Sequence, residues 1–251
     1  MGKPMLTTMS SRLASNTFLG FPLCKELDSL KADVVILGIP YGETYSMDEV
    51  TNDQTNAPLA VRLESARLSD GLDHWDFDLG GPLFGGHDIR VVDCGDVPGD
   101  PTDIKGHYRI AEKAVKTILD RKALPVVIGG DHGVPIPVLR AFDGRGPITL
   151  VHIDAHIDWR DEVNGETEGY SSPIRRASEM PWIDKIVQIG LRGIGSAREP
   201  EVTDARAYGA DMISAYEMHD IGIDAVLDRI PDGGPYYLTI DADGIDPTIM
   251  P

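Results

Sequence analysis

The sequence is poor in cysteine and in basic residues, and each shortage excludes a class of protein. Its two cysteines, Cys24 and Cys94, are too few and too far apart for a disulfide framework or a thiolate metal site. Only 23 Lys and Arg residues stand against 41 Asp and Glu residues, which gives a formal net charge of −18. We therefore expect neither nucleic acid nor an anionic membrane surface as a partner.

Long hydrophobic runs are also missing. No apolar stretch reaches the ~20 residues that a membrane-spanning helix needs, and the first twenty residues lack the continuous apolar core of a signal peptide. We expect a cytoplasmic protein with an irregular N-terminal arm over residues 1–30 and a single domain over residues 31–251. The acidic balance has two interpretations: it keeps a protein soluble, and it favours the approach of a small cationic substrate.

Short apolar runs alternate with segments of helical spacing. The runs predict strands at residues 33–38, 89–93, 124–128, 148–153, 185–189, 210–214 and 236–240. The helical spacing predicts helices at residues 107–122 and 216–229. This order predicts a parallel sheet covered by helices on both faces, with ligand sites at the carboxyl ends of the strands. The polar, Gly-rich segments 48–56 and 70–88 are expected to be long loops that cover the site or form subunit contacts.

Three acidic motifs directly follow three of these strands. They are GGDHG at residues 129–133, DAHID at residues 154–158 and DADGIDP at residues 241–247. Side chains spaced by two residues point to the same side of an extended chain, so the acidic and imidazole groups of DAHID can face one point. Carboxylates with a few imidazoles suit Mn²⁺, and Ni²⁺, Co²⁺ or Fe²⁺ stay open, whereas an all-oxygen Mg²⁺ or Ca²⁺ site would not use histidine.

A charge argument favours two metal ions. Asp154, Asp158, Asp241 and Asp243 would bring four negative charges into one site, and unpaired buried carboxylates would protonate instead. Two divalent ions balance these charges, and ions ~3.5–4 Å apart can turn a shared water into hydroxide. A single Asp-x-His segment is more often only a capped strand end, and His132 alone more often a core histidine. Three such motifs in order favour the metal site.

The motifs resemble the signatures of the ureohydrolase family, which covers arginase, agmatinase, guanidinobutyrase and formiminoglutamase. GIPYG at residues 38–42, VDCGDV at residues 92–97 and VQIGLRG at residues 187–193 extend the resemblance over most of the chain. DEVNGE at residues 161–166 and RRASE at residues 175–179 are closer to agmatinases than to arginases. The resemblance implies a three-layer αβα sandwich with a mainly parallel central sheet, and a homo-oligomer that is a trimer or hexamer.

The resemblance also implies a set of functional residues. Asp154 and Asp241 would bridge two divalent ions, with Mn²⁺ the first choice and Ni²⁺ the alternative. Asp158 would also bind the hydroxide, which makes it a predicted catalytic residue. Attack on a guanidinium carbon would give a tetrahedral intermediate that collapses to urea and an amine. The complete predicted ligand set is His132, Asp154, His156, Asp158, Asp241 and Asp243.

The chain departs from the family pattern on the substrate side. Gly133 replaces the usual serine, and the first-strand loop is acidic and amide-rich where relatives carry Arg-x-Gly. The family loop His-Gly-x-Pro, whose histidine is thought to move protons, reads Tyr170-Ser171-Ser172-Pro173 here. We therefore predict Tyr170 as a catalytic residue, and Tyr170, Ser171 and Ser172 as substrate contacts.

The sequence stops at Pro251, immediately after the third motif. Family members continue with a strand and helices that supply a glutamate for the substrate guanidinium, so we expect either a fragment or an incomplete pocket. The favoured function is an agmatinase-like amidinohydrolase. Two alternatives stay open: a guanidine or biguanide hydrolase that uses nickel, and a catalytically silent, metal-holding subunit paired with an active paralogue.

Overall fold

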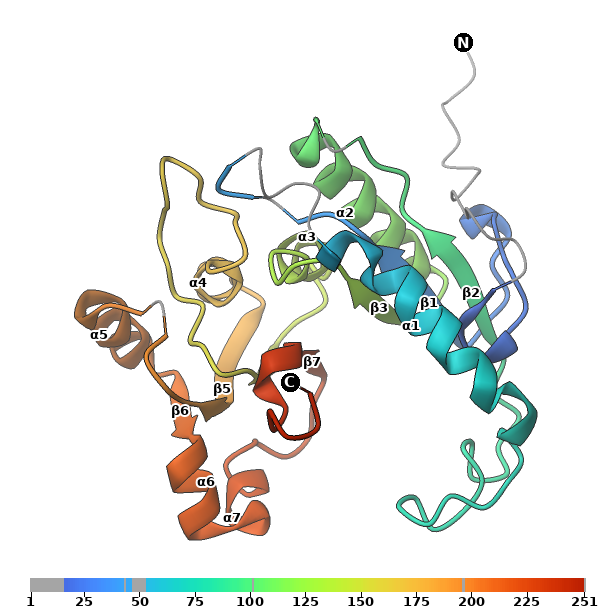
Figure 1. Ribbon diagram of the computed structural model, residues 1–251. Helices are drawn as coiled ribbons and strands as arrows, with labels where there is room; N and C mark the ends of the chain where they lie inside the picture. The colour runs from blue at the N-terminus through green and yellow to red at the C-terminus, as the bar shows by residue number, and fades with distance from the viewer. Residues whose placement is uncertain (1–15, 43, 47–52, 101, 196, 251) are drawn as a thin grey trace. The chain divides into compact units, whose positions relative to one another are not determined.

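The protein has an α/β architecture in the computed structural model, which describes residues 16–42, 44–46, 53–100, 102–195 and 197–250 (Figure 1). The chain forms two compact units. The first unit comprises residues 1–42 and 46–137, and the second comprises residues 43–45 and 138–251. Residues 1–15 of the expected arm, and residues 48–52 of the first expected loop, lie outside the described residues.

The first unit contains a three-stranded parallel sheet in the order β2-β1-β3. Its strands are β1 (Val34–Ile39), β2 (Val91–Asp96) and β3 (Leu124–Gly129). The central strand β1 is almost completely buried, as its uninterrupted apolar sequence predicts. Strand β3 is an edge of this sheet and exposes Leu124 and Val126.

The helices of the first unit pack beside this sheet (Figure 1). They are α1 (Ala57–Ser65) and α2 (Ile104–Asp120), and α3 (Pro135–Arg140) crosses into the second unit. The Asp103 carboxylate caps α2, because it accepts a hydrogen bond of 2.8 Å from the Gly106 amide. Helix α2 then buries an apolar stripe at helical spacing, formed by Tyr108, Ala111, Ala114, Val115 and Ile118.

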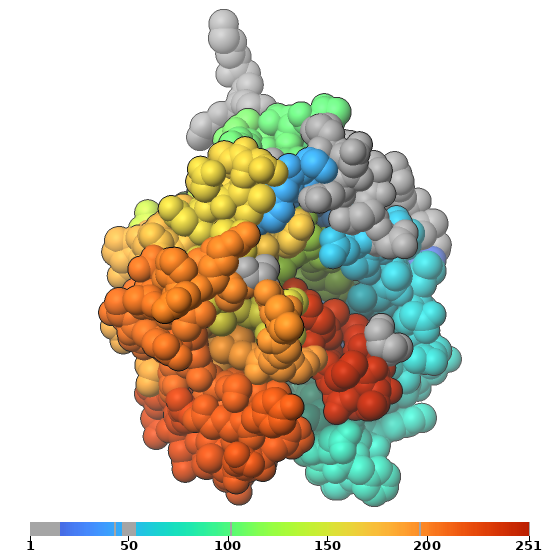
Figure 2. Space-filling model, turned by 60° about the vertical axis from the view of Figure 1, so that its left-hand side comes forward, coloured from blue at the N-terminus to red at the C-terminus, as the bar shows by residue number. Residues whose placement is uncertain are grey.

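The segment between α1 and β2 is irregular, as the sequence predicts for residues 70–88. A short 3-10 helix (Ala66–Gly71) is followed by turns and by a single bridge between Asp76 and Gly81. The side chains of Trp75 and Phe77 are exposed. This segment of the chain is coloured turquoise in Figure 2. Two further 3-10 helices, Phe18–Gly20 and Leu27–Ser29, lie in the described part of the expected arm.

The second unit contains a four-stranded sheet in the order β6-β5-β4-β7. The strands are β4 (Ile148–Ile153), β5 (Ile183–Leu191), β6 (Asp211–Ser214) and β7 (Tyr236–Ile240), and all pair in parallel. Their carboxyl ends therefore share one edge of the sheet, where the second and third motifs follow β4 and β7. This unit has its own core, which includes Leu150, Ile157, Trp159, Ile174, Ala177 and Ile186.

Four helices accompany this sheet: α4 (Pro173–Ser178), α5 (Glu199–Tyr208), α6 (Ala215–Ile221) and α7 (Ile223–Leu227). The prediction of one helix over residues 216–229 is wrong. Gly222 has φ 82° and ψ 164°, a conformation outside the helical region, and it separates α6 from α7. Among the described residues, no helix combines the length and the apolarity needed to cross a membrane.

Candidate metal centre

The second motif begins where β4 ends. The Asp154 amide donates to the carbonyl of Ile189 on β5 over 3.0 Å, which keeps this point of the chain against the sheet. The next residues bend, so the stretch is not extended as the spacing argument assumed. The side chains gather because the Asp154 carboxylate accepts the His156 amide over 2.7 Å, which folds the chain back on itself.

Asp158 is placed by its backbone. Its φ of 47° lies in the left-handed region, which few non-glycine residues adopt. Its carbonyl accepts hydrogen bonds from the amides of Ile174 (3.2 Å) and Arg175 (3.1 Å), in the first turn of α4. Helix α4 therefore holds the backbone of Asp158, whose side chain is buried.

The third motif approaches the second from the end of β7. The Asp241 amide donates to the carbonyl of Ile153 over 2.9 Å, and the Asp241 carboxylate accepts the Asp243 amide over 3.2 Å. The Asp243 carboxylate in turn accepts the Ala155 amide over 3.3 Å. These bonds join the two motifs directly.

Two residues make this close approach possible. A Cβ atom at Gly244 would lie 2.7 Å from the Asp154 nitrogen, so only glycine fits there. The Arg192 guanidinium, just past β5, donates to the carbonyls of Asp243, Gly244 (3.3 Å) and Ile245 (2.9 Å). Arg192 thus fixes the backbone that carries Asp243.

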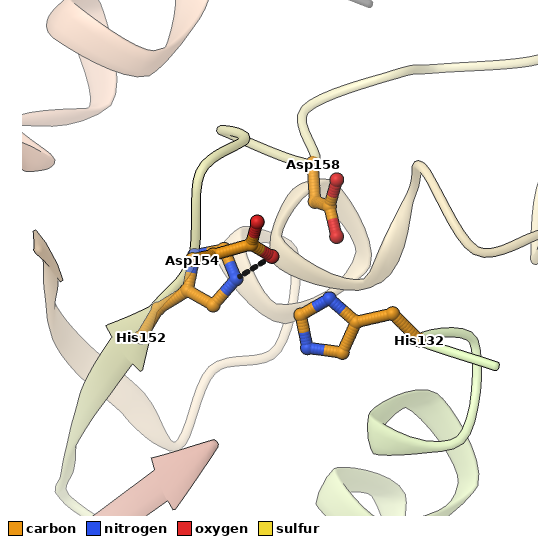
Figure 3. Close-up of side chains that lie close together, drawn as sticks. All are labelled: His132, His152, Asp154 and Asp158. Carbon is orange, nitrogen blue, oxygen red and sulfur yellow. Dashed lines mark hydrogen bonds and ion pairs between the residues drawn. The ribbon is translucent and has the colours of Figure 1, made fainter. Parts of the chain in front are cut away.

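The result is a cluster of possible metal ligands within the second unit. Asp154, His156 and Asp243 each offer a ligand atom, and these atoms lie within 4.8 Å of one another. Asp154 and Asp158 also meet this criterion together with His152, a histidine that the sequence analysis did not select. Figure 3 shows these three side chains together, with a dashed line for the hydrogen bond between His152 and Asp154.

The donor set fits a divalent transition metal. Burial raises the pKa of Asp243 above its ordinary value, and the negative charges of Asp241 and Asp154 raise it further. Carboxylates held so close repel one another, and cations between them would remove that repulsion. The imidazole of His156, 3.3 Å from Asp243 and 3.4 Å from Asp154, adds a nitrogen ligand that favours a transition metal over Mg²⁺ or Ca²⁺.

Of the other predicted ligands, Asp241 is not part of these groupings, and His132 does not belong to the second unit. Asp241 stands at the start of the third motif, bonded to Asp243 as described. His132 belongs to the first unit, where it follows β3 in a turn in which the Asp131 carboxylate accepts the Gly133 amide over 2.8 Å. The roles of Asp241 and His132 as ligands therefore stay predictions from their motifs.

The predicted substrate loop contacts Tyr45, a residue that the sequence analysis did not select. The Tyr45 hydroxyl accepts the Ser171 amide over 3.0 Å, and the rings of Tyr45 and Tyr170 lie 4.6 Å apart. A Cβ atom at Gly169 would lie 2.3 Å from the Tyr45 ring, so Tyr45 packs directly on this loop. Tyr170 is 37 % exposed, whereas Ser171 and Ser172 are buried.

Parallel strands whose carboxyl ends carry clustered carboxylates and an imidazole are typical of a metal-binding α/β protein. Comparison with known proteins identifies the family. The model of the arginase family matches residues 32–251. The chain belongs to the arginase family, a family of binuclear metal enzymes, and the predicted ureohydrolase resemblance is confirmed.

The relatives include several amidino hydrolases. Guanidinobutyrase of Pseudomonas aeruginosa is 32 % identical, over 90 % of this chain and 69 % of its own length. Agmatinase of Bacillus subtilis is 30 % identical, over 88 % of this chain and 71 % of its own. The solved structure of proclavaminate amidino hydrolase from Streptomyces clavuligerus has a TM-score of 0.74 at 28 % identity, over 93 % of this chain and 75 % of its own. The fold is therefore the predicted arginase-like three-layer αβα sandwich with mainly parallel strands.

Proposed function

We propose that this chain is a binuclear metal-dependent amidinohydrolase that cleaves a guanidine C–N bond to give urea and an amine. The observation that carries the proposal is the convergence of Asp154, His156, Asp158 and Asp243 at the ends of β4 and β7. His132 and Asp241 complete the proposed ligand set. The names of the relatives support guanidino compounds as the substrate class.

The proposed metal is Mn²⁺, with Ni²⁺ as the alternative, since both accept carboxylate and imidazole ligands. When bound, a pair of such ions supplies Lewis acidity and makes water nucleophilic near neutral pH. The protein's own part is to hold the carboxylates in place. In this proposal Asp158, whose backbone carbonyl is held by α4, accepts the proton of the attacking water.

Tyr170 takes the place of the family's loop histidine. This replacement favours a small or differently substituted guanidine as the substrate. A phenol is a poor proton donor to an alkylamine at neutral pH, but it is an adequate hydrogen-bond partner for a planar guanidine. The proposed substrate contacts are Tyr170, Ser171 and Ser172, of which Tyr170 has the exposed side chain. This supports the second candidate, a hydrolase of a small or differently substituted guanidine.

Charge and assembly complete the proposal. The net charge of −18 favours a small cationic guanidine over anionic partners. We propose a cytoplasmic homo-oligomer, a trimer or hexamer, and the exposed side chains of Trp75 and Phe77 are candidates for its subunit contacts.

Urea release by the purified chain tests the function. The chain would be loaded with Mn²⁺ or Ni²⁺ and assayed with agmatine, 4-guanidinobutyrate, arginine, guanidine and a biguanide. We expect metal-dependent urea release that Asp158→Asn lowers by ~10²–10⁴-fold, since a proton acceptor of this kind contributes about that factor. Tight metal binding without urea from any compound would favour the silent subunit and contradict the proposed activity.

A further inference from the structure

A row of buried polar side chains crosses the centre of the second unit's sheet. In the register of the parallel strands, His152 on β4 faces Gln188 on β5 and Thr239 on β7. His152 and Gln188 are completely buried, and Thr239 is 8 % exposed. The neighbouring positions on the same strands are apolar. Polar groups in such a place need hydrogen-bond partners, so their bonds reveal what they do.

The hydrogen bonds of Gln188 fix the orientation of its side-chain amide. Its Nε2 atom lies 2.8 Å from the carbonyl oxygen of Ile157 and 2.9 Å from Nδ1 of His152. A backbone carbonyl can only accept a hydrogen bond, so the amide nitrogen must face it. The second hydrogen of that nitrogen is then donated to Nδ1 of His152.

This orientation determines the tautomer of His152. Its Nδ1 atom accepts from Gln188, so the ring proton resides on Nε2. Nε2 lies 2.7 Å from Oδ2 of Asp154 and donates to it (Figure 3). The chain of hydrogen bonds therefore runs from the Ile157 carbonyl through Gln188 and His152 to the carboxylate of Asp154.

His152 lies close enough to Asp154 and Asp158 to be counted among possible metal ligands. Both of its ring nitrogens, however, are engaged in these hydrogen bonds. Coordination by His152 through Nε2 would break its bond to Asp154, and the proton moved to Nδ1 would leave one N–H of the buried Gln188 amide without an acceptor. The geometry fits a support for a ligand better than a ligand.

The carboxylate of Asp154 is held from two sides. Its Oδ2 atom accepts from His152, and its Oδ1 atom accepts the His156 amide over 2.7 Å. Rotation of the carboxylate about the Cβ–Cγ bond would break both hydrogen bonds. Since Asp154 is the predicted bridging ligand, its orientation matters for both metal ions.

We propose that Gln188 and His152 are positioning residues, which orient the Asp154 carboxylate for metal binding and do not bind the metals themselves. This inference rests on the proposed function, because it requires Asp154 to be a ligand. Groups that orient metal ligands through hydrogen bonds typically contribute ~10–100-fold to metal affinity. Metal affinity is therefore the quantity to measure.

The experiment titrates Mn²⁺ into the metal-free full chain and follows free Mn²⁺ by electron paramagnetic resonance. His152→Leu and Gln188→Met remove the donors at nearly constant volume, and we expect each to weaken Mn²⁺ binding by ~10–100-fold. His152→Gln retains an N–H group near the position of the histidine Nε2 atom, so it should recover most of the affinity. The same ranking should appear in the visible spectrum of Co²⁺-loaded protein.

Leu150→Ala is the matched control for packing. Leu150 lies on the same strand and face as His152, two residues earlier, and is equally buried. Its truncation should lower the melting temperature and leave Mn²⁺ affinity unchanged. Thermal unfolding of every metal-free variant shows that the loss of binding occurs in folded protein.

Three outcomes separate the inference from the proposed function. Wild-type affinity in His152→Leu and Gln188→Met, beside normal binding by the wild type, overturns the inference alone. Equal loss in His152→Leu and His152→Gln, with no effect of Gln188→Met, would make His152 a direct ligand and also overturns it. A wild-type chain that takes up no Mn²⁺ contradicts the proposed function, and the inference with it.

Discussion

At the scale of single residues, Asp158 shows how a side chain can be placed by distant backbone. Aspartate adopts a left-handed conformation more readily than most residues, but it still needs support from its surroundings. Here the carbonyl of Asp158 is held by two amides of α4, and the next residue, Trp159, is buried in the core. The direction of the Asp158 carboxylate therefore depends on the docking of α4.

The pair Tyr45 and Tyr170 leads to a prediction on substrate choice. Tyr170→Phe removes the hydroxyl of this side chain and should change the ranking of guanidino substrates without changing metal content. Tyr45→Phe removes the acceptor of the Ser171 amide. It should cost about 1 kcal/mol of stability and raise KM, because the loop loses its anchor. The measurements are urea release over a panel of guanidines, metal content and the free energy of unfolding.

Tyr208→Phe is the control for this pair. The Tyr208 hydroxyl likewise makes one hydrogen bond to the backbone, which it donates to the Ile183 carbonyl over 3.2 Å, and its ring packs on Trp159 in the core. This variant should lose a similar amount of stability and keep the substrate ranking. If all three variants ranked the substrates alike, the loop would have no part in specificity.

At this scale, the sequence predicts the residues of the acidic motifs but not all of the residues that contact them. Asp154, His156, Asp158 and Asp243 could be selected because each follows an apolar run in an acidic motif. His152 could have been found as well, since it lies two residues before Asp154 on the same face of a strand. Gln188 and Tyr45 could not, because their contacts with the site depend on strand register and on chain folding far from the motifs.

At the scale of elements, all the predicted strands are present, with small shifts at their ends. Continuous apolar runs predict buried parallel strands reliably because both faces need apolar residues. The helices α1, α3, α4 and α5 were missed. Helix α4 has only six residues, and α5 buries only Ala205, so neither has a clear apolar period. Better signals for α5 are Pro200 in its first turn and Gly209 after its end.

Gly222, which separates α6 from α7, gives a prediction for an element boundary. Its φ of 82° and ψ of 164° lie in a region that is accessible essentially to glycine alone. Gly222→Ala should therefore destabilise the fold by about 1–3 kcal/mol. Denaturation by urea, with circular dichroism as the signal, measures the change in the free energy of unfolding.

Asparagine substitutions at Gly209 and Gly222 compare two glycines whose backbone conformations differ. Gly209, at the end of α5, has φ 93° and ψ 22°, which is the left-handed helical region that asparagine tolerates. Gly209→Asn should be much milder than Gly209→Ala. At Gly222 the conformation lies outside that region, so Gly222→Asn should be as damaging as Gly222→Ala. Rescue by asparagine at both positions would show that the break at Gly222 is an ordinary helix cap.

At the scale of the whole molecule, the dominant property is the negative charge. Part of the net charge of −18 is spread over the surface, where salt screens it. Another part is concentrated at the strand ends, where burial and then the neighbouring carboxylates raise the pKa of Asp243. Divalent cations should therefore act on stability in two ways, through weak general attraction and through binding at the cluster.

The two effects can be separated by heating the protein with different ions. Mn²⁺ at about 100 times its dissociation constant should stabilise the folded chain by about 2.7 kcal/mol per site, because the unfolded chain lacks the site. For a chain of this size, that corresponds to a rise in Tm of roughly 5–10 °C for each occupied site. A chelator should reverse the rise. Mg²⁺ should give a smaller one, since it does not favour imidazole ligands.

High salt and the substitution Asp154→Asn test whether the stabilisation by Mn²⁺ comes from binding at the carboxylate cluster. Sodium chloride at about 0.5 M weakens general attraction to an acidic surface, but it leaves direct coordination largely intact. The Mn²⁺ effect should therefore persist in salt and disappear in Asp154→Asn, which keeps the shape of the side chain and removes its charge. A rise in Tm that salt abolishes, or that Asp154→Asn retains, would mean that the cations act on the surface as a whole.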